Sequence, residues 1–442
     1  MHRLIQLFRS ISDPNVVRMV WFLLKLAASE AAQRLAIGDA NPFKSLHKTP
    51  TKRHQRTRVC LLIDEYFGGW DTAYGGYGFL ARRLVAKYLP SDEILVEVLL
   101  HRQRVDGLVQ ERMIDGVKVF RLSTSNRFSR YWLLLKRYDV FLSIELTSID
   151  AIRLAPPRTP HILWIQDPRP KREWDEIETV TLFPEPSYYD QEIYDFVAKS
   201  QSSIKFVTQG LFLNDLARDL YALRPSVEID YLANPVEIPA ENDKGLVDKE
   251  DLIIFLGRID SVKRGWIFCE IAKRMPAHQF YVLGAISKDV DRNKEALAPY
   301  IDDAGRSRVP NLHFEGHVDG EQKEAFLRRA KILVNTSIHE ALPVSFLEAL
   351  AARTLIVSCR NPEDLTEKFG FYTGPVLGNG FDRIDDFVKG ISHILGNDDY
   401  RKKIADDGYR YVREKHSIQA FQVAMRNVIA NEVNKHKAGP NH

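Results

Sequence analysis

The segment "HEALPVSFLEALAARTLIVSC" (residues 339–359) decides the fold class, because it reads as a buried helix followed at once by a buried strand. Pro343 suits the first turn of that helix, where the missing N–H of a proline costs no intrahelical hydrogen bond. The segment nevertheless carries two carboxylates, Glu340 and Glu348. Burying an unpaired carboxylate costs several kcal/mol. We therefore expect both glutamates to have partners.

Glu340 falls in the loop before the predicted helix. The backbone amides that follow it lie near the helix start, where free N–H groups and the helix dipole attract anions. These amides belong to Ala341, Leu342, Val344 and Ser345. The helix start is thus a candidate site for a phosphate or a sugar hydroxyl.

Glu348 shares a helical stripe with Val344, Leu347 and Ala351, at spacings of three and four residues. With nearly every face apolar, the helix should be buried, and Glu348 must meet a hydrogen-bonding group. The hydroxyls of a bound ribose would serve, as they do for the acidic residue of dinucleotide-binding folds. The simpler alternative is an ion pair between Glu348 and an internal Arg or Lys, with Glu340 only a loop residue.

Strand and helix patterns alternate upstream of this segment. A short apolar run at residues 58–65 precedes a glycine-rich turn and a helical pattern at residues 79–89. Further strands are predicted at residues 93–100, 116–122, 139–145, 161–166 and 203–209, with helices around 131–138 and 211–221. This succession is typical of a mostly parallel sheet with helices on both faces.

The pattern stops at the polar stretch 239–251 and then restarts. The second series has predicted strands at residues 252–258, 279–285, 311–318, 331–337 and 354–359, and helices at 266–275, 321–330 and 383–395. We therefore predict an α/β protein with two domains that face each other across a cleft. The expected divisions are an N-terminal helical segment with a basic linker (1–57), a first domain (58–238), a linker (239–251), a second domain (252–415), and a C-terminal helix and tail (416–442) that could pack on either domain.

Composition excludes several classes of protein. The chain has 442 residues with 45% hydrophobic and 27% charged content, which is ordinary for a globular protein. A net charge of +3 is too small to demand a nucleic-acid partner. The three cysteines, Cys60, Cys269 and Cys359, show no C-x-x-C spacing, and no H-E-x-x-H occurs. We expect no metal site and a reducing, cytoplasmic location.

The N-terminal apolar stretch at residues 16–24 is interrupted by Arg18 and is too short to span a bilayer. With the basic residues between Lys44 and Arg58, it could form a helix that contacts an anionic membrane surface from the cytoplasm. The alternative is a helix packed on the protein's own core with a solvated basic linker. Nucleic-acid binding through the same basic stretch would show strong salt dependence.

Two loops follow predicted strands. In "FLGRIDSVKRG", Gly257 and Arg258 end the first strand of the second domain, and Lys263 follows. Cations at the carboxyl end of a parallel strand could clamp a diphosphate, although basic loop residues are often only solvated. In the first domain, Gly75 and Gly76 enter a helix and let the backbone approach a ligand, but no G-K-[ST] follows them.

In this order, the motifs resemble those of family-4 retaining glycosyltransferases, which have the GT-B fold of two Rossmann-like domains. The matching pieces are Gly75-Gly76, Asn234-Pro235, Gly257-Arg258 with Lys263, Gly284, "FEGHV" (314–318) and the E-x7-E motif from Glu340 to Glu348. The likeness spans residue 58 to the C-terminus and is more specific in the second domain.

The resemblance implies transfer of a sugar from a nucleotide-sugar donor to a glycan or lipid-linked acceptor in polysaccharide or glycoconjugate biosynthesis. The anomeric configuration would be retained, and neither a metal nor a cofactor is expected. Arg258 and Lys263 would stabilise the departing diphosphate, Glu348 would hold the ribose, and Glu340 would contact the donor sugar. The loop glycines Gly75, Gly76 and Gly257 and the amides of Ala341, Leu342, Val344 and Ser345 would complete the donor site.

Some positions depart from the family pattern. Ala341, Arg264 and Arg353 stand where glycines are common. Many relatives carry His-Asp at the end of a central first-domain strand, where this chain has Gln166-Asp167. Asp167 is therefore a candidate for orienting the acceptor or touching the donor sugar. An aspartate before proline is also an ordinary turn residue.

Two further alternatives remain open. A GT-B nucleotide-sugar epimerase would turn over without an acceptor, and a non-catalytic subunit would bind a nucleotide sugar or glycan without turnover. A phosphorylase would need a pyridoxal lysine, which nothing in the sequence marks. The stretch "RPKREWDEIETV" (169–180) could line the acceptor cleft through its aromatic and charged residues, or form an ordinary surface element.

Overall fold

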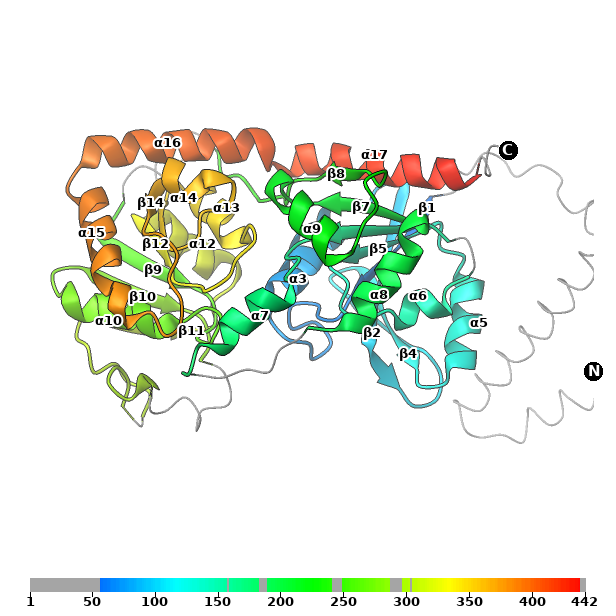
Figure 1. Ribbon diagram of the computed structural model, residues 1–442, viewed down its shortest axis with the longest axis horizontal. Coiled ribbons are helices and arrows are strands. Elements are labelled where there is room, and N and C mark those ends of the chain that lie inside the picture. The colour runs from blue at the N-terminus through cyan, green and yellow to red at the C-terminus, as the bar shows by residue number, and fades with distance from the viewer. Residues whose placement is uncertain are drawn as a thin grey trace, which may run out of the picture.

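The computed structural model describes residues 56–156, 159–182, 189–240, 249–286, 296–302 and 304–437. They form two α/β domains side by side, each built around its own sheet (Figure 1). The N-terminal segment and the central part of the 239–251 linker lie outside the described residues. Within the described part of the chain, no helix is long and apolar enough to cross a membrane.

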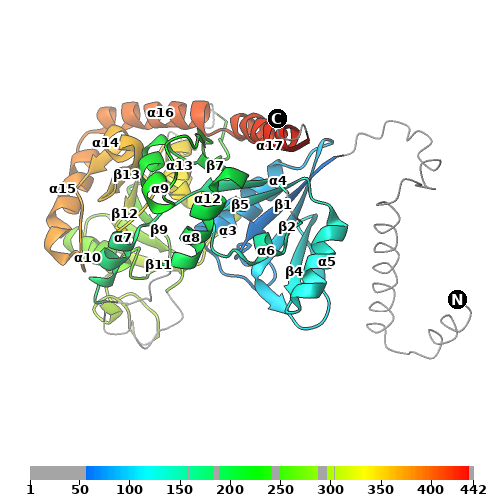
Figure 2. The same cartoon turned by 45° about the vertical axis from the view of Figure 1, so that its right-hand side comes forward.

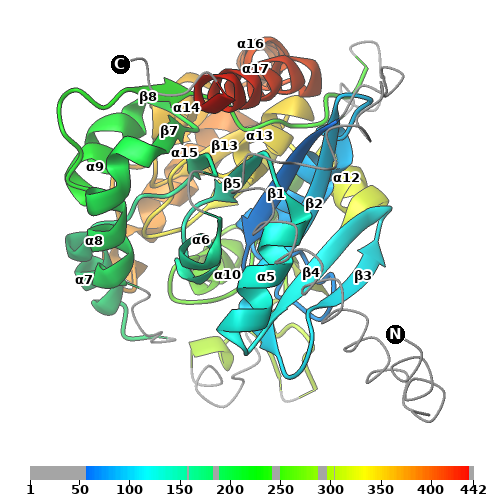
Figure 3. The same cartoon turned by 90° about the vertical axis from the view of Figure 1, so that its right-hand side faces the viewer.

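The first sheet has eight strands in the order β3-β4-β2-β1-β5-β6-β7-β8, all parallel except β3, which pairs with β4 in antiparallel fashion. The strands are β1 (Thr57–Ile63), β2 (Ile94–Val105), β3 (Gln110–Ile114), β4 (Val117–Ser123), β5 (Val140–Ile144), β6 (His161–Ile165), β7 (Ile204–Thr208) and β8 (Ile229–Tyr231). Figure 3 shows β3, β4, β2 and β1 following one another across this sheet.

Helices cover both faces of the first sheet, which is why β1 is apolar from Val59 to Ile63. Val59, Leu61 and Ile63 pack on one face, and Cys60 and Leu62 on the other. The helical elements are α3 (Gly76–Phe79), the π-helix η1 (Leu80–Val85), α4 (Ala86–Tyr88), α5 (Asn126–Lys136), α6 (Asp150–Leu154), α7 (Lys171–Glu178), α8 (Gln191–Ser200), η2 (Gln201–Ser203), η3 (Leu211–Leu213) and α9 (Asn214–Leu220).

The second sheet has six parallel strands in the order β11-β10-β9-β12-β13-β14. They are β9 (Leu252–Leu256), β10 (Gln279–Leu283), β11 (Leu312–Gly316), β12 (Ile332–Asn335), β13 (Leu355–Ser358) and β14 (Gly370–Tyr372). The helical elements are α10 (Gly265–Arg274), α12 (Gly320–Arg329), α13 (Val344–Ala351), η5 (Pro362–Asp364), α14 (Leu365–Lys368), η6 (Phe381–Arg383), α15 (Ile384–Leu395), α16 (Asp398–Lys415) and α17 (Ile418–Lys437).

Each sheet has one switch point, the place at which the strand order changes direction. In the first sheet it lies between β1 and β5, and in the second between β9 and β12. Ligands of open α/β sheets bind beyond the carboxyl ends of the strands at such points. The carboxyl ends of the two sheets approach each other, because the ring of Tyr74, after β1, lies 4.4 Å from the ring of His317, after β11.

The chain crosses between the domains a second time at its C-terminal end. Helix α16 lies on the second domain and α17 runs on along the first, as Figures 1 and 2 show. Phe421 of α17 stacks on Trp164 of β6 with ring centroids 5.7 Å apart, and Gln422 Nε2 donates to the carbonyl of Tyr88. Helix α17 therefore completes the core of the first domain.

Helix α7 belongs to the first domain by sequence but packs on the second. Ile177 and Val180 are buried in the second-domain core, and Trp174 packs against it. The amides of Thr181 and Leu182 donate to Asn379 Oδ1. The stretch 169–180 thus includes a helix that joins the two domains, and its apolar side is occupied by protein.

The two series of predicted strands and helices are present, but one helix begins earlier than predicted, and several elements were not predicted, among them β3, β8, β14, α8 and α16. The hairpin strand β3 was missed, because its residues are polar and mostly exposed at the sheet edge and so show no alternation. Helix α5 begins at Asn126, five residues before the predicted start, with Ser125 as its N-cap.

Candidate active site between the domains

The loop after β9 is held in shape by Asp260, a buried residue. The Asp260 carboxylate accepts the amide of Lys263 at 2.8 Å and lies 3.1 Å from the guanidinium of Arg258. The Arg258 side chain remains more than half exposed. Asp260 thus orders both cations that the sequence places at this strand end.

Two glycines allow this loop to approach the neighbouring strand. A Cβ atom on Gly284, which follows β10, would lie 1.9 Å from the carbonyl oxygen of Gly257. No side chain fits there unless the backbone moves. Gly284 therefore lets Gly257, which is expected to bind the donor, lie directly against the end of β10.

Arg264 explains why glycine is common at its position. Its backbone is left-handed (φ 48°), a conformation that costs any residue other than glycine about 1–2 kcal/mol. The side chain is fully buried, and its nitrogens donate to the carbonyls of Thr336 and Gly378, each at 2.9 Å. Arg353, the second arginine at a usual glycine position, is also left-handed (φ 57°) and lies against Asp406. In both places the arginine side chain makes contacts that a glycine cannot.

Lys263 and Glu340, 77 residues apart in sequence, form an ion pair. The Glu340 carboxylate also accepts hydrogen bonds from the hydroxyl of Ser337 at 2.6 Å and from the side-chain Nδ2 of Asn335 at 3.2 Å. Burial would raise the pKa of Glu340, but Lys263, Ser337 and Asn335 outweigh it and hold the pKa below its ordinary value of 4.5. The structure therefore joins the two residues expected at the diphosphate and the donor sugar into one charged pair.

The start of α13 lies directly after this pair. Pro343 is the N-cap, one position earlier than predicted, and no side chain caps the helix. Ala341 and Leu342 are buried, while Val344 and Ser345 are partly exposed. The first amides of α13 are therefore free of a capping side chain, as an anion-binding helix start requires.

Glu348 lies in α13, where its carboxylate meets Lys323 of α12 at 2.7 Å. Both side chains are largely buried, and the Lys323 ammonium also lies 4.0 Å from the ring centroid of Phe79 in the first domain. The structure thus contains the simpler alternative, an internal ion pair. A ribose at Glu348 would have to share this carboxylate with Lys323.

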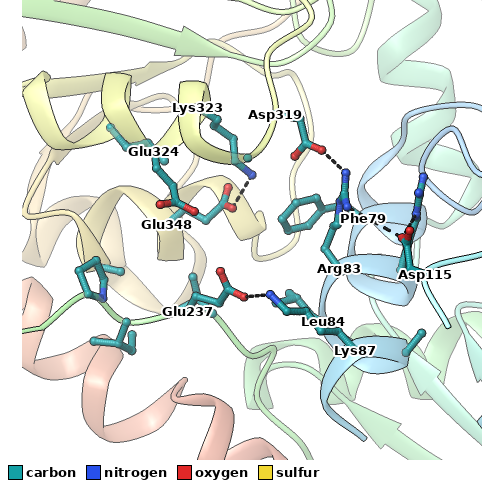
Figure 4. Close-up of a pocket in the computed structure, with 18 of the residues that line it drawn as sticks. Phe79, Arg83, Leu84, Lys87, Asp115, Glu237, Asp319, Lys323, Glu324 and Glu348 are labelled. Carbon is teal, nitrogen blue, oxygen red and sulfur yellow. Dashed lines mark hydrogen bonds and ion pairs between the residues drawn. The ribbon is translucent and has the colours of Figure 1, made fainter. Parts of the chain in front are cut away.

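Glu348 and Lys323 line a pocket of about 840 Å³ between the domains. Figure 4 shows Arg83 and Lys87 of the first domain pointing across it toward Asp319 and Glu237, with which they form ion pairs. Glu340 and Lys263 do not line this pocket. The structure thus places the two glutamates of the E-x7-E motif in different surroundings, one at the strand ends and one beside the pocket.

The glycine turn of the first domain is occupied by Glu65. Its carboxylate accepts the amides of Gly75 and Gly78, each at 3.1 Å, and a Cβ on Gly75 would overlap it. Burial raises the pKa of Glu65, although these amides and the charge of Arg258 act in the opposite direction. Gly76 faces open space. Of the two glycines expected at the donor, only Gly76 has a free approach in this state.

Asp167 lies at the carboxyl end of β6 and pairs with Arg169. Its amide and that of Gln166 donate to the buried carboxylate of Glu145 at 2.9 Å, which fixes the turn after the strand. Burial raises the pKa of Glu145. Burial would lower the pKa of Arg169, but the nearby negative charges, including those of Asp167 and Glu340, outweigh it and raise that pKa. Arg169 therefore links Asp167 electrostatically to Glu340 of the other domain.

Sequence spacing did not point to Glu65, Asp260, Lys323 or His339, which the structure places at this site. Lys323 has a detectable signal, because it falls on the stripe of Phe326 and Leu327, at spacings of three and four residues, where a lysine is unusual. His339 precedes Glu340 and is buried beneath α7, with its Nε2 2.9 Å from Glu176. Burial, together with nearby arginines, lowers the pKa of His339 to about 3.

Comparison with known proteins agrees with this arrangement. Residues 238–411 match the family described as Glycosyl transferases group 1. Sucrose-phosphate synthase from Thermosynechococcus elongatus has a similar structure, with a TM-score of 0.64, 11% identity, and coverage of 85% of this chain and 99% of that chain. HepE from Anabaena has a TM-score of 0.59 and 11% identity, and the match covers 85% of this chain and 100% of that chain. A glycosyltransferase from Rickettsia africae has a TM-score of 0.58 and 12% identity, with coverage of 86% of this chain and 99% of that chain. No curated protein matches the chain by sequence.

The fold is the one shared by the GT-B glycosyltransferases: two α/β domains whose strand ends meet at an interdomain site. The match to the glycosyl transferases group 1 family covers the second domain of this chain. At 11–12% identity, the solved structures show a shared fold.

Proposed function

We propose that the protein is a retaining glycosyltransferase that moves a sugar from a nucleoside-diphosphate donor to a hydroxyl of a glycan or lipid-linked acceptor, without a metal ion. The observation that carries this proposal is the Lys263–Glu340 pair beside Arg258, at the switch point of the second sheet and next to the uncapped start of α13. HepE, which shares the fold, forms a complex with UDP and glucose.

In the proposed mechanism, Arg258 and Lys263 neutralise the diphosphate as its bond to the sugar breaks, together with the first amides of α13. Donors already held in position stabilise such developing charge more effectively than water does. Glu340 would exchange part of its contact with Lys263 for a hydroxyl of the donor sugar. Glu348 would bind the ribose, and Asp167 would orient the acceptor. The three free, buried cysteines suit action in the cytoplasm.

The first test is thermal unfolding with UDP, GDP, ADP, dTDP and CDP. One nucleotide at about 100 times its dissociation constant should stabilise the wild type by about 2.7 kcal/mol. Glu348→Gln should lose most of this effect. The matched control is Glu324→Gln, an exposed glutamate that lines the same pocket and should keep the full shift. Stabilisation of the wild type by none of the five would contradict the donor site, and an unchanged shift in Glu348→Gln would contradict the ribose role.

The second test concerns stereochemistry and acceptor dependence. With the matching nucleotide sugar, the anomeric proton of the product should show the donor's configuration by NMR. Turnover should also rise when acceptor is added. An inverted product would contradict the retaining mechanism. Full turnover to free nucleotide and sugar without acceptor would favour the epimerase alternative, and no turnover in spite of nucleotide binding would favour a non-catalytic subunit.

A further inference from the structure

A second cluster of polar side chains lies at the switch point of the first sheet. Asp64 follows β1, His101 lies in β2, and Thr147 follows β5. His101 Nε2 is 2.7 Å from Asp64 Oδ1 and 3.3 Å from Thr147 Oγ1. The other carboxylate oxygen of Asp64 lies 3.4 Å from Arg102 Nη1. Three adjacent strands thus contribute to one group of hydrogen-bonding side chains.

This cluster occupies the same topological place in its sheet as the Lys263–Glu340 pair does in the second. Both lie beyond the carboxyl ends of the strands that flank a change in strand order. That is where open α/β sheets bind ligands. Glu65, the next residue after Asp64, is turned toward the glycine loop and the charge of Arg258. The carboxylate of Glu65 therefore faces the glycine turn, and the carboxylate of Asp64 lies at the switch point of the first sheet.

Burial and charge make Asp64 a rigid acceptor of hydrogen bonds. His101 is only 1% exposed, whereas the Asp64 side chain is 21% exposed, so the histidine lies behind a carboxylate that solvent can reach. Burial would raise the pKa of Asp64, but His101, Thr147 and Arg102 outweigh it and lower the pKa below its ordinary value of 3.8. At neutral pH, Asp64 is therefore ionised and fixed in orientation, and suits an O–H donor.

We propose that Asp64, positioned by His101, binds a hydroxyl group of the acceptor sugar, with Thr147 and Arg102 beside it. This inference rests on the proposed function. A neutral sugar is the class of ligand that fits, because a hydroxyl can donate to the carboxylate while its own oxygen accepts from Arg102. Asp167, the acceptor residue expected from the sequence, has its carboxylate committed to Arg169 in this state.

The experiment uses the full-length protein with the nucleotide that stabilises it and methyl glycosides of glucose, galactose, mannose and rhamnose as probes. Saturation-transfer NMR should show that at least one glycoside binds the wild type. Asp64→Asn should weaken that binding by about tenfold or more, as expected for loss of a hydrogen bond to a charged group. His101→Gln should raise the KM for the glycoside as acceptor with little change in kcat. The control is Asp230→Asn, which removes a carboxylate of edge strand β8 that pairs with Lys205.

Nucleotide stabilisation, measured on the same samples, separates the two proposals. It should be equal in the wild type, Asp64→Asn and Asp230→Asn. If it is present but no glycoside binds the wild type, or Asp64→Asn binds as well as the wild type, the acceptor assignment is wrong and the donor site stands. If no nucleotide stabilises any of the three proteins, the proposed function fails, and the acceptor assignment fails with it.

Discussion

Lys263→Ala should reduce kcat/KM by about 100-fold, the usual cost of removing one preorganised donor from a transition state that develops negative charge. Lys263 is the cation that contacts Glu340, and the amide of the same residue is tied to Asp260. The alanine variant keeps that backbone contact, so the loop should hold its shape. The loss would then report on the ammonium group.

Steady-state kinetics with the donor identified by nucleotide binding is the measurement. Lys273→Ala is the matched control, because Lys273 is an exposed lysine of α10 that pairs with Glu270 and lies over the ring of Tyr300, away from the Lys263–Glu340 pair. The control should retain wild-type kinetics. A Lys263→Ala enzyme within about threefold of wild type would remove the phosphate-binding role and, with it, the basis of the mechanism.

The same variant should change the acid stability of the protein. The pKa of Glu340 is lowered in the folded state, so its ionised form stabilises the fold above about pH 4.5. That stabilisation is lost as pH falls through the lower, folded-state pKa. Without Lys263, burial raises the pKa of Glu340, and acid unfolding followed by circular dichroism should begin at a higher pH than in the wild type. An unchanged acid transition would mean that Ser337 and Asn335 alone hold the carboxylate.

Arg264→Ala should lower the free energy of unfolding of the second domain by about 3 kcal/mol, because buried hydrogen bonds from a charged group are lost. The carbonyls of Thr336 and Gly378 are then left without these donors. Arg264→Gly loses the same contacts, but glycine adopts the left-handed backbone without strain. It should therefore be about 1 kcal/mol less destabilised than the alanine variant.

Urea unfolding of both variants, with the wild type and Arg274→Ala alongside, tests this prediction. Arg274 is a partly exposed arginine of α10 whose ion pairs lie at the surface, so its loss should cost little. Equal stability of the alanine and glycine variants would show that the left-handed backbone carries no cost. A loss below about 1 kcal/mol in both would show that the buried guanidinium contributes little to stability.

Local periodicity was enough to predict the fold class, and strand-end motifs indicated a candidate donor site that stays a prediction. A parallel strand that is buried on both faces is apolar along its length. Ligand-binding residues of such sheets follow the carboxyl ends of the strands. The stretches "LIIFLGR" and "KILVNTS" therefore indicate both a strand and the end at which a ligand would bind. The exposed edge strand β3 has no such constraint, which is why it left no pattern.

Only the tertiary structure decided which charged groups meet. Glu348 shows by its place on an apolar helix that it needs a partner, but Lys323 becomes that partner because α12 and α13 pack side by side. His101 of β2 lies beside Asp64, which follows β1, because the sheet order places these two strands next to each other. The need to satisfy a buried charge is local and can be read from the sequence. The group that satisfies it is set by long-range packing, on which sequence spacing carries no information.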